Sequence, residues 1–313
     1  MTASPVRPTI PSSMPFLDHI IACNRHDLDG FRRFIVAGAP VGWVRHDLAG
    51  RLADWRRVFQ VSPGEVALSP ALDSFSSRSS AVSEVVERLA EAGDMAPPRD
   101  ELYPVSADFR SPPLMQLDRT AVARFGVTAY GVHMNGYQRE GGTFWLWIAR
   151  RSADRRVAPG ELDNLVAGGQ PIGIGLEDNL VKEAHEEAGI SQRLARCARP
   201  VGAVSYLLEV PEGLRADVLF VYDLELPRDF EPVNGDGEIE AFYRWPAGRV
   251  LAMVRDGGGF KFNVNLVLID FGLRHGLITP EEPDYLALCQ GLRRGAHGIG
   301  SAWREDAGSV AVE

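Results

Sequence analysis

A glycine-rich loop, an amphipathic run and three closely spaced glutamates follow one another between residues 168 and 190. The three acids are Glu183, Glu186 and Glu187. On a helix, residues four apart lie one turn above each other, so Glu183 and Glu187 share a face that Glu186 borders. Gly189 suits the left-handed position at which a helix ends. The segment therefore predicts a loop, a helix with one acidic face, and a sharp stop.

The acidic face of this helix is unfavourable unless a cation lies beside it. Like charges at this spacing weaken an isolated helix by about 0.2–0.5 kcal/mol per pair. Mg2+ takes oxygen ligands, often from a few carboxylates and the phosphates of a substrate. A lone acidic pattern of this kind is usually a solvated helix face. Here a glycine-rich loop precedes the acids and a Gly-aliphatic pair follows them, and because both ends match one pattern the joint signal is much stronger than that of the acids alone.

The whole segment resembles the Nudix box, the signature of Nudix hydrolases. With Gly168 as the first glycine of the box, the spacing to the helix fits without a gap. The resemblance implies an α/β fold in which a mixed sheet lies between helices in an α/β/α sandwich. The positions that match the box are Glu183, Glu186, Glu187, Gly189 and Ile190.

Three positions depart from the box pattern. Lys182 stands where the family has arginine, Ala184 replaces a larger aliphatic residue, and Ile174 replaces an early glutamate. Lys182 keeps a cation that can orient neighbouring carboxylates, although it lacks the planar guanidinium group. The missing early glutamate leaves the number of metal ions open.

The resemblance also implies roles for the residues of the helix. Glu183 and Glu187 would bind Mg2+, with Mn2+ as the alternative metal. Glu186 would bind the metal or hold a metal-bound water. Lys182 would position these carboxylates, so Glu186 and Lys182 both count as catalytic residues in this interpretation.

Residues outside the helix complete the expected site. The family often places its general base on a later loop, where Glu238 is the first candidate and Glu240 the second. A charge pair on an edge strand is the alternative interpretation of these two acids. Four further residues would contact the phosphates, the glycines through close backbone approach and the arginines through paired hydrogen bonds. They are Gly168, Gly169, Arg150 and Arg151.

The pattern of apolar residues and turn signals divides the chain into two domains. We expect residues 1–13 to be disordered, residues 14–113 to form a smaller α+β domain, residues 114–296 to form the Nudix domain, and residues 297–313 to be a tail. The expected helices of the smaller domain are 16–23, 47–59 and 79–92, and its expected strands are 34–36, 41–44 and 103–109.

The Nudix domain is expected to alternate strands and helices. Apolar alternation predicts two strands around Gly141-Gly142 and a short strand that runs into Gly168-Gly169. The later expected strands are 201–210, 218–226 and 238–242, and the expected helices besides the box helix are 118–125, 250–254, 263–274 and 283–292.

A finer resemblance covers the residues around the box. The stretches 159–160, 162–164 and 179–183, with Asp236-Gly237-Glu238 further on, are similar to a Nudix branch that carries an N-terminal domain of about this size. That branch is similar to the Nudix half of fungal thiamine-pyrophosphokinase-related proteins. It implies cleavage of thiamine diphosphate, or of its oxidised and damaged analogues, to the monophosphate and phosphate.

The charge of the chain limits its expected partners. Its 33 Lys and Arg against 42 Asp and Glu give a formal net charge of -9, and the basic residues form no block. We therefore expect a small-molecule diphosphate as partner, neither nucleic acid nor a membrane, and leave a homodimer open. Three widely separated cysteines and the lack of a long apolar run predict a cytoplasmic protein.

Two other functions stay open at the level of sequence. One is hydrolysis of a nucleoside diphosphate derivative such as ADP-ribose, although the substrate motifs usual in those branches do not follow the box. The other is a non-catalytic Nudix-like protein that binds a ligand. The missing early glutamate favours this second alternative, whereas the intact Glu183, Glu186 and Glu187 argue against it.

Overall fold

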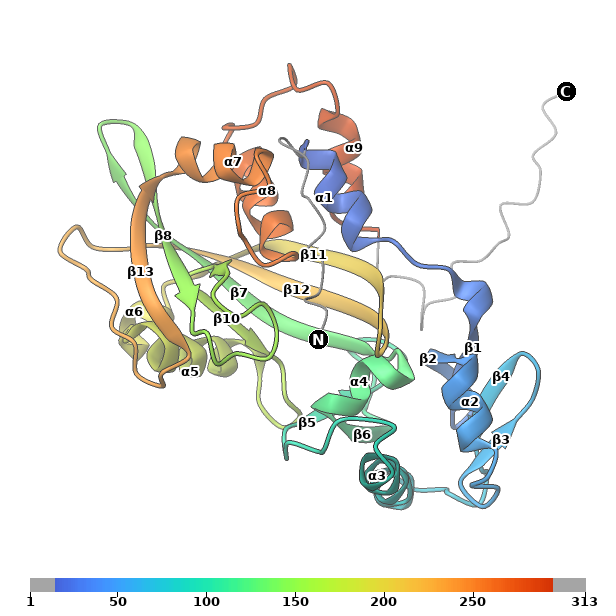
Figure 1. Ribbon diagram of the computed structural model, residues 1–313. Coiled ribbons are helices and arrows are strands. Elements are labelled where there is room, and N and C mark those ends of the chain that lie inside the picture. Colours follow the sequence, from blue (N-terminus) through green and yellow to red (C-terminus); the bar gives the residue numbers. More distant parts are fainter. Residues whose placement is uncertain (1–14, 295–313) are drawn as a thin grey trace, which may run out of the picture.

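A seven-stranded mixed sheet organises the larger part of the protein in the computed structural model, which describes residues 15–294 (Figure 1). Its order is β11-β12-β7-β8-β13, with β10 paired to β7 and β9 paired to β8. Strands β12 and β7 run parallel, and the other pairs are antiparallel. The strands are β7 (Thr128–Glu140), β8 (Thr143–Arg151), β9 (Leu162–Asp163), β10 (Val166–Gly169), β11 (Arg199–Val210), β12 (Gly213–Glu225) and β13 (Ile239–Pro246).

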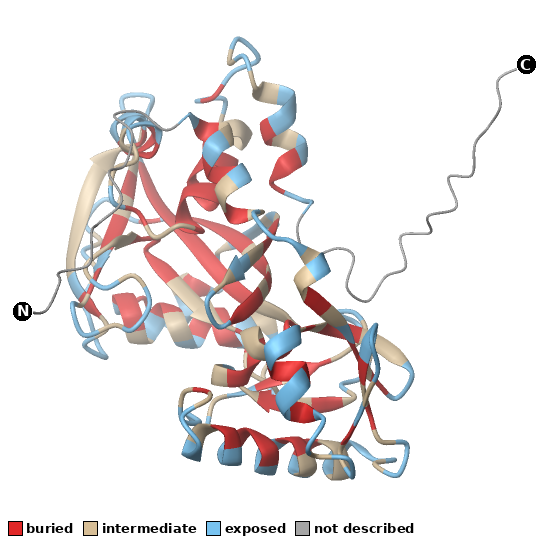
Figure 2. Cartoon of the chain, turned by 45° about the vertical axis from the view of Figure 1, so that its right-hand side comes forward, coloured by how far each residue is buried: buried red, intermediate tan, exposed pale blue. Residues whose placement is uncertain are grey.

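Helices cover both faces of this sheet, and its strands are largely buried between them (Figures 1 and 2). One face packs against α5 (Leu176–Ala188) and α6 (Gln192–Ala195). The other face packs against α1 (Phe16–Cys23), α7 (Ala247–Arg255), α8 (Val264–Arg274) and α9 (Tyr285–Gly291). The predicted α/β/α sandwich with a mixed sheet is therefore confirmed.

The smaller α+β part precedes this sheet in the chain and has its own apolar core. Its four-stranded sheet has the order β2-β1-β4-β3, and a separate pair joins β5 and β6. The strands are β1 (Phe31–Val36), β2 (Ala39–Arg45), β3 (Phe59–Val61), β4 (Glu65–Leu68), β5 (Leu102–Val105) and β6 (Met115–Asp118). The helices are the short 3-10 turn Leu28–Gly30, α2 (His46–Leu52), α3 (Phe75–Glu91) and α4 (Arg119–Phe125).

Packing crosses the predicted division at residues 113 and 114 in both directions. Helix α1 lies in the predicted first domain, yet it packs on α7 to α9, and His19 Nε2 lies 2.7 Å from the Val254 carbonyl oxygen. Helix α4 lies in the predicted second domain, yet it buries Val122 and Phe125 in the core of the smaller part. Each of these two helices therefore packs with the part of the protein on the other side of the predicted boundary. The division into domains itself stays a prediction.

Two predicted elements of the smaller part are wrong in extent. The predicted helix 47–59 ends at Leu52 in α2, because Phe59 instead begins a strand that pairs with β4. The predicted strand 103–109 ends at Val105, because the Asp108 side chain accepts hydrogen bonds from the backbone of residues 110 and 111 and forms a turn. Strands β3 and β4 were not predicted. The predicted segments 1–13 and 297–313 lie outside the described residues.

None of the helices in residues 15–294 has the length and apolarity needed to cross a membrane.

Candidate active site

Helix α5 carries the acids of the box and ends as predicted at Gly189, whose φ is 66°. Its apolar side, with Leu180 and Ala184, is buried against the sheet. Of the two acids four residues apart, Glu187 accepts a hydrogen bond from the Ala167 amide of β10, and Glu183 lies against Gly168 of the same strand. The helix is therefore pinned to the sheet with its acidic side along the edge of that strand.

Glu187 is the most enclosed of the box acids, with an exposed fraction of 4%. Its Oε2 accepts a hydrogen bond of 2.8 Å from the Ala167 amide. Burial raises the pKa of Glu187 well above its usual range, the Ala167 amide opposes this, and the negative charges of Asp163, Glu183 and Glu238 raise it further. A cation beside Glu187 would relieve this repulsion.

Lys182 joins the other two box acids. Its Nζ donates hydrogen bonds of 3.0 Å to Glu183 Oε1 and 2.8 Å to Glu186 Oε2. Burial alone would lower the pKa of Lys182, but the bonds to Glu186 and Glu183 raise it overall. Burial likewise raises the pKa of Glu183, and Lys182 offsets part of that effect. These contacts agree with the positioning role that we predict for Lys182.

Strand β10 separates the box acids from a cavity, because successive residues of a strand face opposite sides. A Cβ atom on Gly168 would lie 2.7 Å from Glu183 Oε2, so only glycine leaves room for this carboxylate. Gly169 faces the other way, toward the Tyr103 side chain of β5. Because neither glycine has a side chain, only the backbone of Gly168 and Gly169 separates the box acids from the cavity at this point.

Gly168→Ala should lower turnover by about tenfold or more, comparable to the loss of a supporting partner of a metal site. The added methyl group would push the Glu183 carboxylate away, while the flexible side chain of Glu183 lets the fold survive. Steady-state kinetics and a melting curve test this. Gly175→Ala is the matched control, because a Cβ on Gly175 meets nothing within 4 Å. Equal loss of activity in both variants would contradict the prediction.

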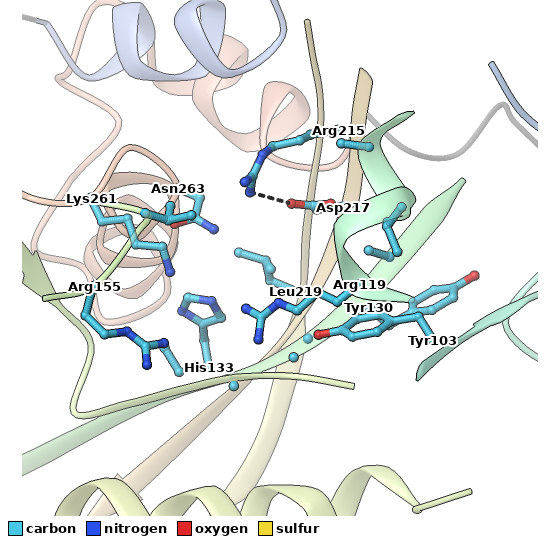
Figure 3. A pocket seen from close by; sticks show the side chains of 18 of the residues that line it. Tyr103, Arg119, Tyr130, His133, Arg155, Arg215, Asp217, Leu219, Lys261 and Asn263 are labelled. Atoms are coloured by element: carbon cyan, nitrogen blue, oxygen red, sulfur yellow. Dashed lines mark ion pairs between the residues drawn. The ribbon is translucent and has the colours of Figure 1, made fainter. Parts of the chain in front are cut away.

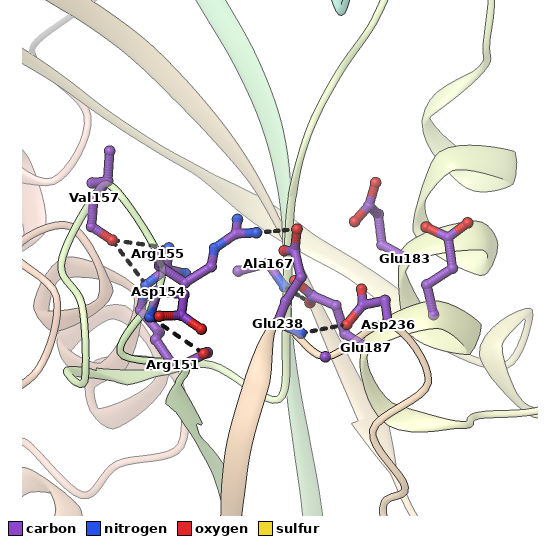
Figure 4. A network of polar contacts seen from close by, with 12 residues as sticks. Arg151, Asp154, Arg155, Val157, Ala167, Glu183, Glu187, Asp236 and Glu238 are labelled. Atoms are coloured by element: carbon purple, nitrogen blue, oxygen red, sulfur yellow. Dashed lines mark hydrogen bonds and ion pairs between the residues drawn. The ribbon is translucent and has the colours of Figure 1, made fainter. Parts of the chain in front are cut away.

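The two candidates for the general base occupy different surroundings. Glu238 forms an ion pair with Arg155 and lies near the box acids, since its charge raises the pKa of both Glu183 and Glu187 (Figure 4). Glu240 lies 3.6 Å from Arg150, and both side chains are largely exposed. The position of Glu238 suits a base, whereas Glu240 and Arg150 form a surface pair.

Arg151, predicted to bind phosphate, is buried and its donors are occupied. It donates to Asp163 Oδ2 at 2.7 Å and to the carbonyl oxygens of Val157 and Ala158. Lys261 Nζ also donates to Asp163 Oδ2, at 3.4 Å. These contacts hold the loop after β8, so a phosphate would have to compete with Asp163 for Arg151.

The cavity has a volume of about 180 Å³ and lies between the sheet and the smaller α+β part (Figure 3). Its basic side chains come from segments that are far apart in the sequence. Among the residues that line it, Asp217 is the single acid. Tyr103, Tyr130 and Leu219 supply apolar surface. The basic residues in its wall are Arg99, Arg119, Arg151, Arg155, Arg215 and Lys261.

Most of these basic residues were not predicted from the sequence. Arg99 lies in the predicted smaller domain, Arg119 in the predicted helix 118–125, and Arg215 just before the predicted strand 218–226, and none of the three had an expected role. One compositional signal was available. The chain has two lysines among its 33 Lys and Arg, and both Lys182 and Lys261 lie at the site.

The box acids have the donor chemistry that Mg2+ prefers, but their side chains do not converge. Among residues 15–294, no group of three or more His, Cys, Asp or Glu side chains is arranged to hold a metal ion. Two of the acids instead share Lys182, and the third binds a backbone amide. Mutual repulsion among buried carboxylates nevertheless fits a divalent cation, which would compensate it.

Comparison with known proteins gives relatives for almost the whole chain. Residues 15–129 match a family described as "Domain of unknown function (DUF4743)". Over 284 residues the chain is 43% identical to "Nudix hydrolase 24, chloroplastic" of Arabidopsis thaliana, covering 90% of this chain and 78% of that protein. Over 289 residues it is also 43% identical to "Nudix hydrolase 20, chloroplastic" of the same plant, covering 89% and 77%.

Solved structures include DR0079 from Deinococcus radiodurans, which is 22% identical and aligns with a TM-score of 0.42. The alignment covers 54% of this chain and 97% of that chain.

Proposed function

This chain belongs to the Nudix hydrolase family, and on that premise we propose that it cleaves the diphosphate of a small organic diphosphate in a Mg2+-dependent reaction. One observation carries the proposal. Strand β10 places a cavity with six basic side chains against the box acids, so a substrate's phosphates and a metal can meet at the same backbone. Basic side chains bind phosphate oxygens through charge-assisted hydrogen bonds.

The residues divide into metal ligands, a base and phosphate-binding groups. Glu183, Glu186 and Glu187 would hold Mg2+. When bound, that ion neutralises phosphate charge and lowers the pKa of a bound water. Glu238 would accept the proton of the attacking water, and its ion pair with Arg155 keeps the carboxylate in place. Lys182 would keep Glu183 and Glu186 in position.

For the organic group we propose thiamine diphosphate or its oxidised analogues, which would yield the monophosphate and phosphate. The resemblance around the box supports this class. The cavity adds two arguments: its volume of about 180 Å³ suits a small ring system, and its tyrosines can pack on a ring. Its basic wall favours analogues whose organic part carries no positive charge of its own.

A phosphate-release screen tests this assignment. The substrates are thiamine diphosphate, its oxidised analogues, ADP-ribose and a dinucleotide, each with Mg2+, with Mn2+ and with a chelator. We expect release of one phosphate from the thiamine compounds, no activity with the chelator, and recovery when Mg2+ is added back. Faster cleavage of ADP-ribose or the dinucleotide would replace the proposed substrate, and inactivity towards all of them would favour the non-catalytic alternative.

The smaller α+β part should contribute to substrate binding through Arg119. This side chain lines the cavity and pairs with Glu101 at 2.7 Å. Arg119→Ala removes a charge-assisted contact worth about 1.5–3 kcal/mol, so KM should rise about tenfold or more with little change in kcat. Arg88→Ala is the control, because Arg88 is an exposed residue of α3 that forms an ion pair with Glu91 and does not line the cavity. An unchanged KM in Arg119→Ala would show that Arg119 does not contribute to substrate binding.

We also propose a cytoplasmic location and leave a homodimer open.

A further inference from the structure

The cations in the wall of the cavity differ in how far nearby acids compensate them. Arg99 is exposed to solvent, and Lys261 has no assigned role in the hydrolysis. Each of the other four has a carboxylate partner within 4.0 Å. These pairs are Arg119–Glu101, Arg151–Asp163, Arg155–Glu238 and Arg215–Asp217.

The ammonium group of Lys261 is enclosed, yet it makes few of the contacts that it can make. Its side chain is 13% exposed, and Nζ can donate three hydrogen bonds. Among residues 15–294, Nζ has one hydrogen-bond partner, Asp163 Oδ2, at 3.4 Å. The same oxygen accepts from Arg151 at 2.7 Å, so two cations share one buried carboxylate. A positive charge therefore remains at this point, and a bound anion would compensate it.

The backbone around Lys261 keeps the ammonium group at the cavity. The Lys261 amide donates to the Leu162 carbonyl oxygen at 2.9 Å, and the Leu162 amide donates to the Gly259 carbonyl oxygen at 2.9 Å. Phe260, between these two positions, is buried in the core. Burial lowers the pKa of Lys261, and the attraction of Asp163 offsets only part of that effect. Lys261 is thus a fixed and poorly solvated cation.

The cavity is enclosed around Lys261 and open towards the smaller α+β part. His133, which lines the cavity, is 3% exposed. Burial, with the positive charge of Lys261, lowers the pKa of His133 to about 4, so this ring is neutral near pH 7. On the open side Arg99 is exposed, and the side chain of Arg119 is 42% exposed. A charged group that enters from the open side therefore meets Lys261 at the enclosed end.

The enclosed end of the cavity is also the end next to the box acids. Ala167 lines the cavity, and its amide donates to Glu187. The negative charge of Glu187 raises the pKa of Lys261, so the two groups interact. Figure 3 shows Lys261 on the side of the cavity away from Tyr103 and Tyr130. A substrate therefore fits with its last phosphate at Lys261 and its organic ring towards the tyrosines.

We propose that Lys261 binds the terminal phosphate of the substrate and makes the protein specific for diphosphates whose terminal phosphate carries no second organic group. A free terminal phosphate brings about two negative charges to Lys261 near pH 7. An esterified one brings fewer charges, and its second organic group would have to enter the enclosed end. Thiamine diphosphate and its oxidised analogues meet this requirement, whereas ADP-ribose and dinucleotides do not. This inference rests on the proposed function, because it places the cleaved diphosphate in the same cavity.

Equilibrium binding without Mg2+ tests the terminal-phosphate site separately from hydrolysis. The probes are thiamine diphosphate and its analogue with a methyl ester on the terminal phosphate. Calorimetry should show at least about tenfold tighter binding of the free diphosphate to the full-length protein. Equal dissociation constants, or no binding of either probe, would overturn the inference. Selective binding without phosphate release in the presence of Mg2+ would leave it standing and overturn the proposed hydrolysis alone.

Variants then assign the preference to Lys261. Lys261→Met keeps the apolar stem and removes the charge, so thiamine diphosphate should bind at least about tenfold more weakly, while binding of the methyl ester changes much less. Arg156→Met is the matched control, because it removes the same charge from an exposed residue outside the cavity wall. If Lys261→Met fails to fold, Lys261→Gln, which keeps a neutral donor for Asp163, replaces it. A full preference in a folded Lys261 variant would contradict the inference.

Discussion

Glu187→Gln should lower kcat by at least about 100-fold, the upper range for loss of an outer partner of a metal site. Glutamine keeps the size of the side chain and an oxygen that can accept from the Ala167 amide. It removes the buried negative charge that the proposed metal needs. Because that charge is repelled by Glu183 and Glu238, the metal-free variant should melt no lower than the wild type.

Steady-state kinetics at saturating Mg2+ and a melting curve without metal test this prediction together. Glu177→Gln is the matched control, since Glu177 lies on the same helix but is exposed and forms an ion pair with Arg196. We expect this control to keep normal turnover. A Glu187→Gln enzyme with near-normal kcat would show that the box helix does not hold the reaction centre.

Arg274→Met should destabilise the protein by about 3–5 kcal/mol, because it removes a positive charge that compensates two buried carboxylates. Arg274 donates to Asp223 and to Asp270, each at 2.6 Å, and both acids are 2% exposed. The melting temperature should fall by roughly 10 °C. Arg196→Met, which breaks an exposed pair on α5, should change it little. A loss below about 1 kcal/mol would contradict the prediction.

The same variant should shift the acid sensitivity of the fold. Burial alone would raise the pKa of Asp223, but hydrogen bonds from His275 and Arg274 lower it to about 2. A depressed carboxyl pKa stabilises the fold above the unfolded value of 3.8, and this contribution is lost as the pH falls toward 2. Without Arg274 the loss should begin at a higher pH, which acid titration followed by circular dichroism would show.

The sequence predicted the helix and the strands around the box because their signals are local. Spacing and a terminal glycine define α5, and alternation around Gly141-Gly142 defines β7 and β8. The helix expected at 47–59 failed because the strand partner of Phe59 is β4, and pairing with β4 is a tertiary contact. Local propensity does not decide such a segment.

The candidate site was predictable only in its acidic half. Glu183 and Glu187 follow from helical spacing, but the basic wall is assembled from β6–α4, β12 and the loop before α8. Arg119 and Arg215 have no sequence pattern that links them. Asn263 was predicted only as the first residue of a helix, and its contact with the hydroxyl of Tyr206 on β11 is a tertiary contact that no local pattern signals.

The packing of α1 on α7 and α9 makes the smaller part an insertion within the catalytic fold. The described residues begin with α1 on the larger part, leave it after Cys23 and return at β7, so both ends of the insert are anchored. Between them, Arg45 of β2 donates to Glu209 Oε1 and to the Val210 carbonyl oxygen of β11. Because the insert is connected to the larger part at both ends and also contacts β11 through Arg45, it cannot rotate as a body about a single hinge. A minimal catalytic fragment should therefore be made by internal excision with retention of α1, because cutting off the N-terminus would strip a helix from the core.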